Sequence, residues 1–162
     1  MADQTISLGE TAMIAGRSWH VSHRFDAVAN DATINVLINV EIGAKPFVVG
    51  DIETEGKAYV EIYEGVTTSS DGTGLTSFNR NRNEVFTDGV VVSHTPTITD
   101  SGTLIDTSMI AGGATPGHRT IGGGSEVGAD WVFKSDTKYV IAITNKSGSA
   151  IDISVHLDTW QR

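Results

Sequence analysis

The main pattern along the chain is a strict alternation of apolar and polar residues. Between positions 33 and 43, every second residue is apolar: Ile34, Val36, Ile38, Val40 and Ile42. A helix would scatter these side chains around its circumference, so the spacing predicts a β-strand with one apolar face. Leu37 is the one residue of this segment that breaks the alternation.

The same period of two recurs in three other segments. Residues 57–64 alternate, and so do residues 138–144 and 151–158. A short polar turn with a glycine, residues 145–149, separates the last two segments. We therefore expect residues 137–160 to form an antiparallel hairpin.

The middle of the chain is less regular. Short strands are predicted at residues 90–92, 104–110 and 127–133, whereas residues 67–74 have the composition of a flexible loop. Residues 111–124, AGGATPGHRTIGGG, form the longest segment without a strand pattern. A loop of that length in a compact domain usually has a function or is mobile.

About eight or nine short strands predict an all-β protein, a jelly-roll-like β-sandwich. We assign it to residues 17–162 and expect residues 1–16 to form an N-terminal arm, because they lie outside the strand pattern. An immunoglobulin-like sandwich is the alternative, but its strands are more evenly spaced and it needs only about 100 residues. The 19 threonines and 18 glycines agree with strands joined by many turns.

Composition and charge exclude several classes of function. The chain has 11 Lys and Arg against 20 Asp and Glu, a net charge of −9, which disfavours a nucleic-acid partner because phosphates need cationic contacts. No apolar run is long enough for a membrane helix, and the first residues show no signal peptide, so we expect no membrane partner. The absence of cysteine excludes disulfides and thiolate sites.

The residues that carry chemistry form no catalytic pattern. His20 and His23 are three positions apart in a predicted strand, so they point to opposite faces and do not chelate one ion. No His-x-His pair of the cupin type, no phosphate-binding glycine loop and no Gly-x-Ser-x-Gly sequence is present. We therefore expect no catalytic residue, no metal and no cofactor, although the oxygen-rich turns at residues 71–73 and 100–106 leave calcium binding open.

Arg80 and Arg82 alternate with three asparagines in residues 79–83, a local inversion of charge in an acidic chain. In a strand, both arginines would lie on one face. This pattern fits an edge strand that is protected from aggregation by its charge. It equally fits a subunit interface, where guanidinium groups meet carboxylates of a neighbouring chain.

Several short motifs resemble those of a known family: VEIYEG at 60–65, NRNR at 79–82, TPT at 95–97, DSGT at 100–103, Trp131, and the segment 139–148. Over about residues 58–160, the chain resembles tailed-bacteriophage virion proteins of the head decoration, or cement, type. The resemblance implies a sandwich subunit, commonly a homotrimer, on the outer capsid surface at three-fold positions. It implies no catalytic residues.

The resulting hypothesis is a non-enzymatic decoration protein that stabilises the shell of the virion. Its expected partners are the major capsid protein and other copies of itself, and it would assemble in the host cytoplasm. Arg80 and Arg82 are the predicted subunit contacts. The predicted capsid contacts lie in the arm and in the glycine-rich loop: Ile6, Leu8, Gly112, Gly113, His118 and Arg119.

Two other functions remain open. A receptor- or glycan-binding fibre or tail module of a phage has the same fold, and Trp19, Trp131 and Trp160 are candidate platforms for sugar stacking. Large aromatic residues in strands are, however, more often part of the core. A jelly-roll enzyme would need a metal or a pair of carboxylates that the sequence does not single out.

Overall fold

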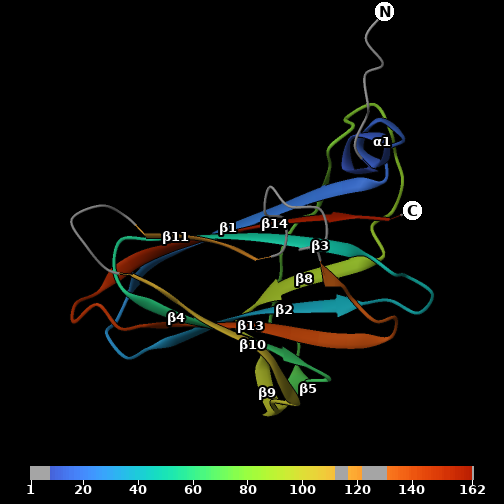
Figure 1. Cartoon of the computed structure of the whole chain (residues 1–162). Helices are drawn as coiled ribbons and strands as arrows, with labels where there is room; N and C mark the ends of the chain where they lie inside the picture. Colours follow the sequence, from blue (N-terminus) through green and yellow to red (C-terminus); the bar gives the residue numbers. More distant parts are fainter. Residues whose placement is uncertain (1–7, 112–116, 122–130, 162) are drawn as a thin grey trace, which may run out of the picture.

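Two antiparallel β-sheets face each other in the computed structural model, which describes residues 8–111, 117–121 and 131–161 (Figure 1). Eight strands form the main part of the two sheets, four in each. In chain order they are β1 (Ser18–Val28), β2 (Thr33–Val40), β3 (Phe47–Thr54), β4 (Ala58–Glu64), β10 (Thr103–Ile110), β11 (Gly117–Ile121), β13 (Thr137–Asn145) and β14 (Ile151–Trp160). The all-β class expected from the alternation is confirmed.

The order of the strands is that of a jelly roll. The first sheet runs β11-β3-β14-β1 and the second sheet runs β10-β4-β13-β2. Successive strands cross from one sheet to the other, except that β4 and β10 are neighbours in the second sheet. This arrangement is the double Greek key of eight-stranded jelly rolls.

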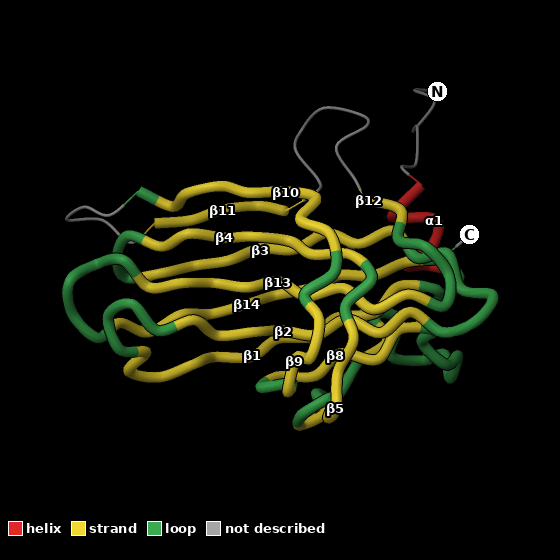
Figure 2. Tube along the Cα trace, turned by 90° about the horizontal axis from the view of Figure 1, so that it is seen from below, coloured by secondary structure: helices red, strands yellow, loops and turns green. Residues whose placement is uncertain are grey.

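A long excursion between β4 and β10 adds five short strands. They are β5 (Thr67–Ser70), β6 (Thr73–Gly74), β7 (Phe78–Asn79), β8 (Val90–His94) and β9 (Thr97–Asp100). β8 and β6 extend the second sheet beyond β2, and β7 extends the first sheet beyond β1. β5 and β9 pair only with each other and form a separate ribbon, here called the β5–β9 ribbon, which crosses the second sheet from outside (Figures 1 and 2). A last short strand, β12 (Trp131–Val132), pairs with β3.

The core lies between the two sheets, where the apolar positions of the alternating segments meet. In β2 these positions are Ile34, Val36, Ile38 and Val40, and the last three are almost completely buried. Matching positions of β4, β13 and β14 complete the cluster. The predicted faces of these strands are therefore confirmed.

The expected hairpin of residues 137–160 is wrong. β13 pairs with β2 and β4 in the second sheet, whereas β14 pairs with β1 and β3 in the first. The turn between them is a corner that joins the two sheets. Asn145 holds this corner, because its buried amide donates hydrogen bonds to the carbonyls of Val28 (2.8 Å) and Ser149 (2.7 Å).

Two segments without a clear strand pattern also form strands. Residues 67–74 contain β5 and β6, and the glycine-rich segment contains β11, which pairs antiparallel with β3. In both cases backbone hydrogen bonding to a neighbouring strand overrides a weak local propensity. Of the strand expected at 127–133, residues 131–132 form β12, and residues 127–130 lie outside the described residues.

The end of the expected arm is helical. Leu8–Ile14 form α1, which contacts β1 and β14 and buries Ala12 (Figure 1). Residues 1–7 lie outside the described residues. In the described part of the chain, no helix has the length and apolar character needed to cross a membrane.

Candidate functional site

The β5–β9 ribbon covers an apolar spot on the outer face of the second sheet. Leu37, Val140 and Ala142 are buried on that face together with Val66 at the start of the ribbon. Tyr63 and Ile98 pack against these four residues. Leu37, the residue that broke the alternation of β2, therefore belongs to a second small core beneath the ribbon.

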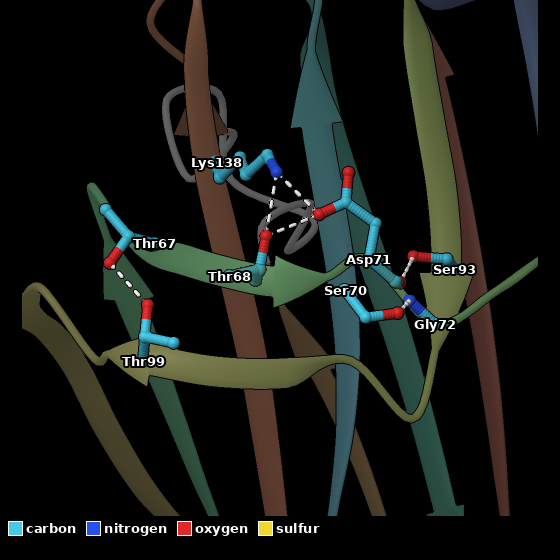
Figure 3. A network of polar contacts seen from close by, with 8 residues as sticks. All are labelled: Thr67, Thr68, Ser70, Asp71, Gly72, Ser93, Thr99 and Lys138. Atoms are coloured by element: carbon cyan, nitrogen blue, oxygen red, sulfur yellow. Dashed lines mark hydrogen bonds and ion pairs between the residues drawn. The ribbon is translucent and has the colours of Figure 1, made fainter.

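Polar contacts fix the ribbon to the sheet (Figure 3). The Nζ atom of Lys138, on β13, lies 2.5 Å from Oδ1 of Asp71 and 2.8 Å from the hydroxyl of Thr68. The Thr68 hydroxyl also donates a hydrogen bond to Asp71. The hydrogen bonds from Lys138 and Thr68, in that order, lower the pKa of Asp71 and keep its carboxylate charged.

Two glycines fix the path of the chain at the ends of the ribbon. Gly72 and Gly102 have φ angles of +81° and +67°. A Cβ atom would lie 2.2 Å from the carbonyl oxygen of His94 at Gly72, and equally close to that of Glu64 at Gly102. Only glycine fits such an approach, so the chain packs closely against the end of β8 at Gly72 and against the end of β4 at Gly102.

A hollow of about 280 Å³ opens between the ribbon and the sheet. Its lining combines apolar and polar side chains: Thr33, Asn35, Glu61, Tyr63, Val66, Ile98, Ser101, Val140, Ala142 and Thr144. The Tyr63 hydroxyl donates to Oε2 of Glu61 at 3.0 Å, and the hydroxyls of Thr33 and Thr144 are 2.7 Å apart. Burial, followed by the Glu61 carboxylate, raises the pKa of Tyr63, so the phenol stays neutral.

The outer face of the first sheet carries a separate polar group. One carboxylate, that of Asp158, binds two partners, because Nδ1 of His20 lies 2.8 Å from Oδ1 and Nη1 of Arg80 lies 3.1 Å from Oδ2. The ring of His156 stacks beside that of His20, with the centroids 6.0 Å apart. Arg80 is thus paired within its own chain, although its side chain is 45% exposed.

The segment with alternating arginines is not a strand. β7 ends at Asn79, and the guanidinium group of Arg82 lies over the ring of Phe78 at 5.3 Å. The asparagines fix the segment, since the amides of Asn79 and Asn81 donate to the carbonyls of Gly16 (2.7 Å) and Ile14 (2.8 Å) at the end of α1. The asparagines at every second position of this segment therefore serve hydrogen bonding and do not mark one face of a strand.

His20 and His23 point to opposite faces of β1, as the spacing predicted. The ring of His23 stacks on that of His94 with centroids 4.3 Å apart, far from the Asp158 group. Burial, followed by the charge of His94, lowers the pKa of His23. Within residues 8–111, 117–121 and 131–161, no three His, Asp or Glu side chains converge on a possible metal site.

The predicted capsid contacts fall at separate places. Leu8 begins α1, while His118 and Arg119 lie in β11, where their backbones pair with Glu53 and Ile52. β3 and β14 separate β11 from β1, the strand on which α1 packs, so the structure does not bring these positions together. The other three candidates, Ile6, Gly112 and Gly113, lie outside the described residues.

The tryptophans do not form a common platform. Trp19 is 4% exposed, and its indole donates to the carbonyl of Phe86 at 3.3 Å. Trp160 stacks on Phe47 with centroids 5.7 Å apart, and Trp131 packs against the main core.

The hollow beneath the ribbon was not predicted from the sequence. Leu37 was the signal for it, because an apolar residue that breaks the alternation implies that another segment of the chain covers it.

Comparisons with known proteins give no family. No protein-family model matches the chain, and no curated protein matches it. Among solved structures, a chain from infectious bursal disease virus, Gx strain, is 11% identical with a TM-score of 0.21, covering 90% of this chain and 41% of the viral chain. A chain from the Gt strain is also 11% identical, with a TM-score of 0.15 and coverage of 87% and 41%.

The chain therefore spans less than half the length of those two viral chains. Likeness at these TM-scores defines neither the fold nor the function. The assignment of the jelly roll rests on the strand pairing alone.

Proposed function

We propose that the chain is a non-enzymatic structural subunit of a virus particle, a head decoration protein that binds the major capsid protein on the outer surface of the shell. The strand order carries this proposal, because eight-stranded jelly rolls recur in capsid proteins. The resemblance of several short motifs to those of phage decoration proteins supports it from the sequence. Such a protein has to bind a repeated surface and needs no catalytic machinery.

Two exposed features of the described residues suit contact with other chains. β10 is an edge strand that pairs with β4, and its side chains Leu104 and Met109 are exposed. Edge strands accept a further strand from a partner. At the end of the molecule that carries α1, Ile14, Val85 and Phe86 are exposed apolar side chains, and Val85 is 98% exposed.

In this proposal the subunit forms a homotrimer before it binds the shell. Arg80 and Arg82 are both exposed, and the guanidinium groups of both can donate hydrogen bonds to a carboxylate of a neighbouring subunit. A trimer would carry three times −9, or −27 charges, which favours solubility during assembly in the cytoplasm. The absence of cysteine agrees with assembly in a reducing compartment, where disulfides could not stabilise the subunit.

The test is binding to shells of the cognate major capsid protein, with occupancy and position read from an image reconstruction. Saturable density on the outer surface supports the proposal. Particles without added density at saturating protein contradict it.

Solution mass tests the subunit contacts separately. We expect a trimer at micromolar concentration that Arg80→Glu and Arg82→Glu weaken. Arg24→Glu is the matched control, because Arg24 is an exposed cation paired with Asp26 of the same chain at 2.6 Å. An unchanged trimer mass in the two variants would remove both arginines from the interface, and a monomeric wild type would remove the trimer.

A further inference from the structure

We propose that the hollow beneath the β5–β9 ribbon is a binding site for a neutral sugar. None of the described lining residues belongs to β10 or to the α1 end, the surfaces assigned above to protein contacts. The inference therefore stands independently of the decoration proposal. It rests on the composition, size and fixed shape of the hollow.

The lining suits a polyhydroxylated ring. A sugar offers apolar C–H faces together with hydroxyl groups that both donate and accept. The apolar part of the hollow matches the C–H faces of a sugar, since Val140 and Ala142 of β13 are buried apolar residues and Tyr63 supplies an aromatic side chain. Aromatic rings provide contact area at little cost in side-chain entropy.

The polar groups of the hollow supply the directional contacts. Glu61 accepts hydrogen bonds, the Asn35 amide both donates and accepts, and hydroxyls of three residues do the same: Thr33, Ser101 and Thr144. Glu61 is already oriented by the hydrogen bond from Tyr63. A carboxylate that is held in place accepts strong hydrogen bonds from ligand hydroxyls.

The charge of the lining selects among ligands. None of the described lining residues is Lys, Arg or His, and Glu61 is an anion, so a phosphate or an acidic sugar would be repelled. A purely apolar ligand would remove Glu61 and Asn35 from water without giving them partners, which is unfavourable. A neutral, hydroxyl-rich molecule satisfies both conditions.

The size and rigidity of the hollow set the scale of the ligand. At about 280 Å³ it lies just below the range of roughly 300–1,000 Å³ for drug-sized sites, so it fits about one sugar ring. The roof is held by Lys138, Asp71 and Thr68, and by the hydroxyls of Thr67 and Thr99, 3.0 Å apart across the ribbon (Figure 3). A preformed site loses little entropy on binding.

The test is an NMR titration of the isotope-labelled full chain with glucose, galactose, mannose and N-acetylglucosamine, each added separately. We expect saturable shifts for at least one sugar at the amides of residues 61–66 and 140–144, with a Kd in the millimolar range. Glu61→Gln and Tyr63→Ala should each weaken binding by about tenfold or more, because each removes a direct contact.

Glu53→Gln is the control, since Glu53 is an exposed carboxylate on β3 of the other sheet, and it should leave the affinity unchanged. Backbone amide spectra show whether each variant is folded, and Tyr63→Phe replaces Tyr63→Ala if the latter is not. Absence of saturable shifts with all four sugars at up to about 0.1 M would overturn the proposal. Shifts confined to other surfaces, or equal affinity in Glu61→Gln, would also overturn it.

Discussion

Replacing Leu37 by alanine tests whether the β5–β9 ribbon is packed as an integral part of the fold. Leu37 is 1% exposed on the outer face of β2 and contacts the cluster of Val66, Val140 and Ala142. The substitution removes three buried carbon atoms, which costs about 2.4 kcal/mol at about 0.8 kcal/mol each, before any cavity is counted. The ribbon can settle inward, so we expect a total of about 2–3 kcal/mol, near the lower end for such changes.

The assay is urea denaturation, supported by a thermal melt. A loss of 2–3 kcal/mol should lower Tm by about 4–12 °C in a domain of this size. Leu104→Ala is the matched control, because Leu104 is 46% exposed on β10, and it should cost less than about 1 kcal/mol. Equal losses in the two variants would refute the packing of the ribbon on the sheet.

Three further predictions concern polar groups. Burial raises the pKa of Asp88 to about 6 from 3.8, so the folded state holds the proton more tightly than the unfolded state. The free energy of unfolding should therefore fall by up to about 3 kcal/mol as the pH rises from 3.8 to about 6. Asp88→Asn should abolish this fall when urea denaturation is measured across that range. Asn145→Ala should cost about 2–3 kcal/mol, because the buried carbonyl of Val28 and the partly buried carbonyl of Ser149 lose their donor, and a loss below about 0.5 kcal/mol would show that the corner does not need the amide. Lys138→Met should raise the pKa of Asp71 in an NMR titration while costing less than about 1 kcal/mol, since the pair is partly exposed, and an unchanged pKa would exclude the contact.

The strands of the two sheets were predictable where one face of the strand is buried and the other is exposed to solvent. β2, β4 and β14 follow this rule, because burial of every second side chain leaves a period of two in the sequence. Their partners were not predictable. β13 and β14 have the same pattern whether they pair with each other or with distant strands such as β2 and β1, more than 90 residues away, so the turn sequence alone suggested the hairpin.

The candidate site was the least predictable part. The ribbon strands are short, polar and rich in threonine and serine, so their strand character depends on the cross-strand partner. The residues that line the hollow come from β2, β4, β13 and the ribbon, and only the folded chain places them together. The alternation in residues 79–83 did not indicate a strand for a related reason, since asparagines that hydrogen-bond near the end of α1 also alternate with their neighbours.

The strand order also determines when the protein can fold. β1 lies beside β14, and β2 beside β13, so neighbours within each sheet come from opposite ends of the described chain. A ribosome delivers β1 and β2 first and leaves them without these neighbours until residues 137–160 have been synthesised. Such distant pairings form slowly, typically in milliseconds to seconds, and expose unpaired edges meanwhile. The two sheets are therefore expected to complete their pairing only once residues 137–160 are available, and the early strands are most prone to aggregation before then.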